Sequence, residues 1–151
     1  AASGKRVLIA GSGGLSHDPP IPNIATVPPE RRAFLIDGRN PSPESVKLRM
    51  ARVLDAAREA AAGGGASLPP NAEWDRGFLD LMVEGKTAIL DDWRDEEVNE
   101  VAGCGGGEVR TWLAAFAALT VGGSYDVTIE QYQVVPGWLT GMGLVRANSI
   151  G

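Results

Sequence analysis

The chain has 151 residues, a length typical of one domain with a real hydrophobic core, and its formal net charge is −5. Hydrophobic residues make up 44% and charged residues 22%, as in ordinary globular proteins. An acidic chain without a basic cluster lacks the concentrated cations that phosphate contacts require. No apolar run approaches the roughly 18 residues of a membrane span. We therefore expect neither nucleic acid nor membrane as a partner.

Cysteine and histidine each occur once, as Cys104 and His17. A single cysteine cannot form an internal disulfide, which fits a reducing compartment, and we expect a cytoplasmic location. One cysteine and one histidine cannot supply the three or four nitrogen and sulfur ligands of a zinc site. Any catalytic site that needs two histidines must therefore draw one of them from outside this chain.

The first predicted element is a strand at residues 7–10 (VLIA), between Gly4 and Gly11. A continuous apolar run of this length is typical of a strand that is covered on both faces. Such a strand needs neighbours, and the rest of the sequence offers few. We expect further strands to come from a missing segment or from another chain, and we expect a homo-oligomer because free sheet edges favour association.

Helices are expected next. A short helix is predicted at residues 30–36, after a proline-rich loop, and should end near residues 37–38. Ser42 as a capping hydroxyl, with Pro43 at the first helical position, predicts a longer helix that ends at the glycines of residues 63–65. Its apolar residues recur at helical spacing and form one stripe: Val46, Met50, Val53, Leu54 and Ala57.

The second half of the chain predicts three more helices and a strand. Asn71 caps a helix that stops at Gly85 and has one apolar face, formed by Trp74, Phe78, Leu81 and Met82. A short acidic helix is expected at residues 95–102, and a long helix from residue 108 to about residue 121. Residues 125–135 alternate loosely and predict a strand that leads into a turn. The expected fold class is α/β, helix-rich with a few strands.

The glycine-rich loop, residues 11–20, follows the first predicted strand and contains His17. Ligands usually bind at the carboxyl ends of strands in α/β folds, and histidine is the side chain that exchanges a proton near neutral pH. A histidine that only hydrogen-bonds the loop backbone is the alternative. A dinucleotide-binding loop is disfavoured, because position 16 is Ser rather than Gly and the prolines that follow oppose a helix start.

Glu108 is the second candidate, because it starts a helix that is apolar on nearly all sides. Residues 108, 112, 115 and 119 fall in one column of this helix, so we expect the carboxylate to be at least partly buried. A buried charge is unfavourable unless it is paired or binds a metal. An acid at a helix N-terminus is also stabilised by the helix dipole, so both interpretations remain open. Cys104 has no neighbouring cation in the sequence and is not expected to be a nucleophile.

Residues 13–20 (GGLSHDPP), with the predicted strand before them, resemble the signature of class III extradiol ring-cleavage dioxygenases. The resemblance is strongest to the subfamily that acts on 2,3-dihydroxyphenylpropionate. It continues through three further segments and covers nearly the whole chain: residues 71–81, 108–118 and 136–138.

This resemblance implies extradiol cleavage of a catechol such as 2,3-dihydroxyphenylpropionate with O₂, in aromatic catabolism, on Fe(II) held by two histidines and one glutamate. The family's glutamate ligand matches Glu108, and its acid–base histidine matches His17. Ser16, Asp18 and Pro19 are expected to contact the substrate.

The two metal histidines lie in the family's N-terminal half, which this sequence lacks. The resemblance therefore implies that residues 1–151 form the C-terminal part of a single catalytic domain. We expect the sheet and the iron site to be completed by an absent N-terminal half or by a partner chain, and we expect the isolated chain to be inactive. The alternative is a non-catalytic module of the same fold that acts in assembly.

Overall fold

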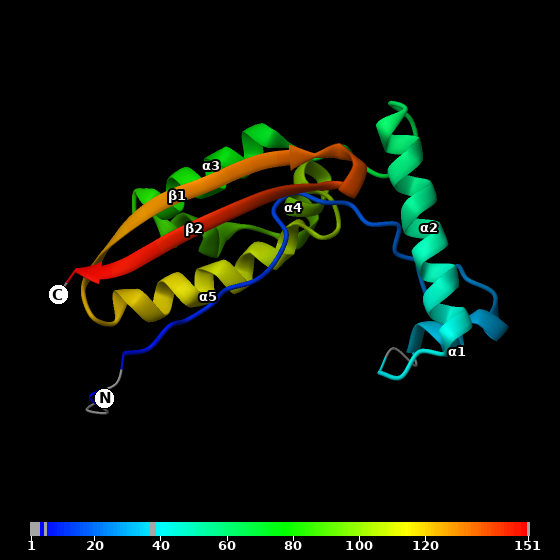
Figure 1. Cartoon of the computed structure of the whole chain (residues 1–151), viewed down its shortest axis with the longest axis horizontal. Helices are drawn as coiled ribbons and strands as arrows, with labels where there is room; N and C mark the ends of the chain where they lie inside the picture. The colour runs from blue at the N-terminus through cyan, green and yellow to red at the C-terminus, as the bar shows by residue number, and fades with distance from the viewer. Residues whose placement is uncertain (1–3, 5, 37–38, 151) are drawn as a thin grey trace.

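The computed structural model describes residues 4, 6–36 and 39–150, and it shows a helix-rich α/β fold (Figure 1). The α-helices are α1 (Pro29–Ile36), α2 (Pro43–Ala61), α3 (Ala72–Val83), α4 (Asp95–Ala102) and α5 (Val109–Thr120). The short 3-10 helices are η1 (Thr87–Asp92), η2 (Gly106–Glu108) and η3 (Pro136–Trp138), and the strands are β1 (Ser124–Val135) and β2 (Thr140–Ile150).

Strands β1 and β2 form a two-stranded antiparallel sheet, and η3 connects them. The register pairs Ser124 with Ile150 at one end and Val135 with Thr140 at the other, with an irregularity between Ile129 and Gln131. This long hairpin lies against α3 and α5 (Figure 1). An isolated bridge from His17 to Thr140 attaches the glycine-rich loop to the start of β2.

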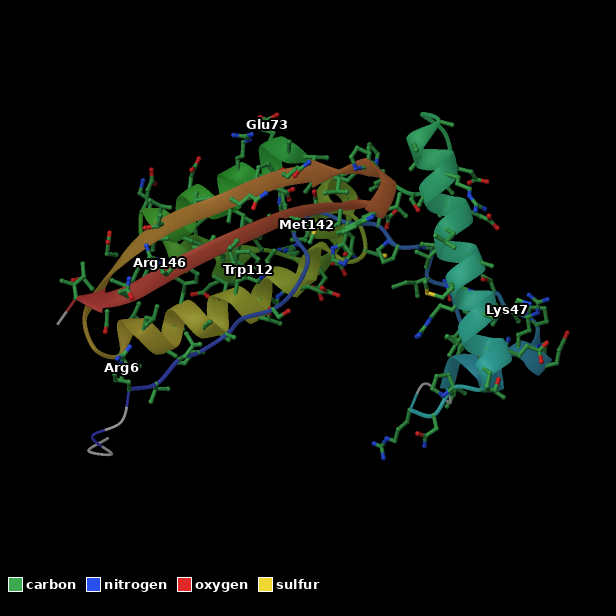
Figure 2. The ribbon with its side chains drawn as sticks, viewed as in Figure 1. Arg6, Lys47, Glu73, Trp112, Met142 and Arg146 are labelled. Atoms are coloured by element: carbon green, nitrogen blue, oxygen red, sulfur yellow. The ribbon has the colours of Figure 1, made fainter. Side chains whose placement is uncertain are left out.

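The hydrophobic core lies between the hairpin and helices α3 and α5. Trp112 extends from α5 toward β2 (Figure 2), and its ring meets that of Phe78 on α3 edge to face. Leu15, which belongs to the glycine-rich loop, is fully buried in the same cluster. The buried members of the cluster are Leu15, Phe78, Leu79, Met82, Leu90, Val109, Trp112 and Phe116. The loop is therefore anchored in the core.

The helix predictions are confirmed, and local capping signals mark where two of these helices, α2 and α3, begin. The hydroxyl of Ser42 accepts a hydrogen bond from the N–H of Ser45, and the side chain of Asn71 caps α3 in the same way. The predicted end of the first helix, near residues 37–38, lies outside the described residues. None of the described helices is long and apolar enough to cross a membrane.

The predicted strand at residues 7–10 is wrong for this structure. The segment forms no strand, and Val7 and Leu8 leave 75% and 92% of their surface exposed. A strand exists only through hydrogen bonds to a neighbour, and no described strand is hydrogen-bonded to this segment. The apolar stripe of α2 is likewise largely uncovered, since Met50 and Leu54 are exposed. Strand β2 was not expected from the sequence.

Replacing Phe78 by Ala should lower the free energy of unfolding by about 3–5 kcal/mol, because the ring is almost fully buried among Trp74, Trp93 and Trp112. Val83→Ala, at an exposed position of the same helix, should change it by about 0.5 kcal/mol or less. Urea denaturation measures both values. Equal effects of the two substitutions would contradict the assigned core.

Candidate functional site

The glycine-rich loop lies directly against α5. A Cβ atom added at Gly11 would lie 2.7 Å from the carbonyl oxygen of Thr111, and one added at Gly13 would lie 2.7 Å from that of Glu108. The hydroxyl of Thr111 donates to the Ser12 carbonyl at 2.7 Å, and the indole N–H of Trp112 donates to the Gly13 carbonyl at 3.0 Å. These glycines therefore allow close contact between the loop and α5. No helix follows the loop directly.

This contact brings His17 and Glu108 together, although 91 positions separate them in the sequence. The Nδ1 atom of His17 lies 2.8 Å from the carbonyl oxygen of Leu15. A carbonyl can only accept a hydrogen bond, so Nδ1 carries the proton and Nε2 of the neutral ring keeps its lone pair. Nε2 lies 3.6 Å from Oε1 of Glu108.

The carboxylate of Glu108 is held by the loop and not by its own helix. Its Oε2 atom accepts a hydrogen bond of 2.8 Å from the N–H of Gly14, whereas no side-chain bond caps α5. The Glu108 side chain is 54% exposed, which is more than the sequence analysis expected. Glu108 lies in η2, one residue before α5, and not within the long helix that the sequence predicted to start there.

The imidazole of His17 is more enclosed, with 15% of the side chain exposed. Gly14 and Gly105 lie so close to the ring that a Cβ atom at either position would collide with it. The backbone of His17 is fixed too, because its N–H donates to Ala102 and its carbonyl accepts from Gly105. The site therefore combines a fixed imidazole with a half-exposed carboxylate.

Ser16 is fully buried behind the histidine. Its N–H and its hydroxyl donate to the two carboxylate oxygens of Asp75, at 2.6 Å and 3.0 Å. The hydroxyl also accepts from the N–H of Asn71 at 2.7 Å, and Tyr132 donates to Asp75 at 2.8 Å. Burial raises the pKa of Asp75, although the hydrogen bonds from Ser16 and Tyr132 act in the opposite direction.

Asp75 and Tyr132 are site residues that the sequence analysis missed. A signal for Asp75 was present, because it shares the inner face of α3 with Phe78, Leu79 and Met82. An acid on an otherwise apolar face needs buried partners. The sequence does not reveal that those partners are Ser16 and Tyr132, which lie 59 and 57 positions away.

Asp18 and Pro19 extend the loop toward Cys104. The carboxylate of Asp18 accepts from the N–H of Leu68 at 2.8 Å and from that of Cys104 at 3.0 Å. Although partial burial acts in the opposite direction, these hydrogen bonds hold the pKa of Asp18 below its ordinary value. The thiol of Cys104 lies 3.6 Å from the Pro19 carbonyl oxygen. Substrate contact by Ser16, Asp18 and Pro19 stays a prediction.

The donor set around Glu108 fits part of a metal site. Among the described residues, no group of three histidine, cysteine, aspartate or glutamate side chains is placed to hold an ion. The whole chain has one histidine. A single half-exposed carboxylate fits one ligand of the two-histidine, one-carboxylate arrangement that binds Fe(II). At least one of the nitrogen ligands would then come from outside this chain.

Comparison with known proteins identifies the family of this chain. The family model described as the catalytic LigB subunit of aromatic ring-opening dioxygenase matches residues 2–143. The chain belongs to this family, the class III extradiol dioxygenases.

The chain is also similar to individual curated proteins. The chain is 47% identical over 146 residues to the 2,3-dihydroxyphenylpropionate/2,3-dihydroxicinnamic acid 1,2-dioxygenase of Rhodococcus jostii. It is 47% identical over 150 residues to the enzyme of that name from Paraburkholderia xenovorans, and 44% over 147 residues to the one from Azotobacter vinelandii. These alignments cover 97%, 99% and 97% of this chain but 46%, 48% and 47% of the relatives. The chain thus spans about half the length of the curated relatives it matches.

Cys104 provides a test of the loop electrostatics. Burial, together with the hydrogen bond and negative charge of Asp18, raises the pKa of this thiol from 9.0 to about 11. The pH midpoint of its alkylation by iodoacetamide should therefore lie near 11 in the folded chain. Asp18→Asn should lower the midpoint, whereas Asp91→Asn, the same change at an exposed position of η1, should leave it unchanged. A midpoint near 9 in the unsubstituted chain would contradict this geometry.

The same pKa shift has a consequence for stability. The folded chain holds the thiol proton more tightly than the unfolded chain, so this group's contribution to stability is lost as the pH rises from 9 toward 11.

Proposed function

We propose that this chain contributes a carboxylate ligand and an acid–base residue to an Fe(II) site that cleaves a catechol with O₂. The observation that carries the proposal is the distance of 3.6 Å between Oε1 of Glu108 and Nε2 of His17, which lies on the glycine-rich loop. The proposed substrate is 2,3-dihydroxyphenylpropionate or a similar catechol, because the relatives named above act on that compound. The proposed enzyme is an oxidoreductase that incorporates both atoms of O₂.

Glu108 is the proposed metal ligand. Its Oε2 atom is oriented by the N–H of Gly14, and half of the side chain is accessible to an ion. Preorganisation of this kind favours metal binding, because little side-chain freedom remains to be lost. Bound Fe(II) would supply the redox chemistry and the coordination positions that a catechol and O₂ require.

His17 is the proposed acid–base residue, and Nε2 is the atom that moves the proton. The hydrogen bond from Nδ1 to Leu15 leaves the lone pair on Nε2, which lies 3.6 Å from Oε1 of Glu108. From this position Nε2 can accept a proton from a catechol hydroxyl and return it later in the reaction. Gly14 and Gly105 enclose the ring and limit its rotation, so the acceptor atom stays aimed at the same place.

The metal histidines are proposed to lie in a polypeptide that also covers the exposed N-terminal segment. A cavity of about 350 Å³ lies between residues 7–11, helix α5 and β2, and most of its lining is apolar. Val7 and Leu8 are exposed beside it. An added strand alongside residues 7–10 would use their backbone groups and bury these side chains. The length of the relatives, about twice that of this chain, supports such a partner segment.

The proposal is tested in the complete enzyme, meaning this chain together with the polypeptide that carries the metal histidines. His17→Ala should lower turnover about 100-fold or more while iron content stays near that of the unsubstituted protein, because only proton transfer is lost. Glu108→Ala should lose iron first, because a ligand is removed. Glu100→Ala, at an exposed position on α4, is the control.

Metal analysis and oxygen consumption measure the two effects. The reverse pattern, with iron lost from His17→Ala and retained in Glu108→Ala, would overturn the assigned roles. A complete, iron-loaded assembly without ring-cleavage activity would favour the non-catalytic module.

A further inference from the structure

Asp75 is a buried carboxylate that the proposed chemistry does not use. It projects from α3 and is fully buried. Its two oxygens receive three hydrogen bonds, two from Ser16 and one from Tyr132. Gly141 of β2 lies so close that a Cβ atom there would collide with the carboxylate. A leucine could fill such a position without the unfavourable desolvation of a charge, so the carboxylate calls for a reason beyond packing.

Most of these hydrogen bonds to Asp75 come from Ser16, the residue directly before His17. Every polar atom of Ser16 is bonded: its N–H and hydroxyl to Asp75, its hydroxyl also to the N–H of Asn71, and its carbonyl to the N–H of Gly141. Asp75 is the only side chain among these partners, because the other bonds come from backbone groups. Among these partners of Ser16, which together with Ser16 we call the clamp, Asp75 is therefore the one whose bonds a substitution can remove.

The clamp determines where the imidazole lies. The carbonyl that accepts from Nδ1 belongs to Leu15, directly before Ser16, and the ring belongs to the residue directly after it. Fixing Ser16 thus fixes both the donor and the acceptor of the bond that orients the ring. Tyr132 extends this constraint to β1, and the side chain of Arg76 lies over its ring at 5.0 Å.

We infer that Asp75 is a positioning residue for His17: it holds Ser16 so that Nε2 of the imidazole stays directed at Glu108. This inference rests on the proposed function, in which Nε2 moves the substrate proton. The inference and the proposed function can be tested separately, because the orientation of the imidazole ring can be measured without turnover.

The direct readout is the imidazole of the 151-residue chain, which has no other histidine. At a fixed pH of 8.5, ¹⁵N-labelled chain should show the tautomer with the proton on Nδ1, as the bond to Leu15 requires. In Asp75→Asn, and to a smaller extent in Tyr132→Phe, the ring should shift toward a mixture of both tautomers. Asp80→Asn, the same change at an exposed position of α3, should leave the spectrum unchanged.

The second readout is the kinetics of the complete enzyme. Asp75→Asn should lower kcat by about 10-fold to 100-fold, because a small misplacement of a catalytic group slows the chemical step. KM should stay within about twofold and iron content should be unchanged. Tyr132→Phe should act in the same direction with a smaller effect, and it decides the question if Asp75→Asn does not fold.

Two results would overturn the inference. One is an unchanged tautomer and an unchanged kcat in both variants, even with lowered stability, since that defines a purely structural role. The other is loss of iron, or a raised KM with kcat unchanged, since these assign Asp75 to the metal or to substrate binding. Failure of the proposed function would show differently: His17→Ala would retain turnover, while the tautomer measurement would still decide whether Asp75 orients the ring.

Discussion

The hydrogen bonds between Ser16 and the buried carboxylate of Asp75 set the position of the glycine-rich loop. A loop without regular secondary structure has no ladder of its own to hold it, so its backbone groups must bond to the surrounding elements. Here those elements are α3, the end of α4 and the start of β2. Leu15 adds an apolar anchor in the core, next to the polar anchor of Ser16.

This anchoring explains why a flexible sequence can carry a fixed functional group. Hydrogen bonds to a charged partner contribute about 1.5–3 kcal/mol each, and an unpaired carboxylate at this depth would be strongly destabilising. The loop and Asp75 therefore stabilise one another. With Ser16 fixed, the glycines that precede it can lie against α5 and against the imidazole, which leaves His17 and Glu108 facing one another.

Much of the fold could be predicted where the signal was local. Ser42 and Asn71 identified two helix starts, because capping depends on only a few neighbouring residues. The prediction of a strand at residues 7–10 was wrong, since a strand needs a partner that no local pattern supplies. Strand β2 was missed because its glycines weaken the strand pattern. Gly141 is there to make room for Asp75, and Gly143 for Leu15 and Trp112.

The candidate site likewise contains residues that the sequence could predict and residues that it could not. His17 and Glu108 could be identified from residue type, position and a family resemblance, and the structure brings them within 3.6 Å. The exposure of Glu108 could not be predicted, because it depends on how distant segments pack around the start of α5. Asp75 could be recognised as unusual on its helix face, but its partners come from segments more than 50 positions away, and only tertiary packing connects them.

The most direct measurement of the central claim is the position of iron in a crystal of the complete enzyme, located by anomalous scattering at the iron edge. The account predicts one iron bound by the carboxylate of Glu108, with nitrogen ligands from outside residues 1–151. The imidazole of His17 should lie in the same pocket without binding the metal. Iron coordinated by His17, or bound away from Glu108, would contradict it.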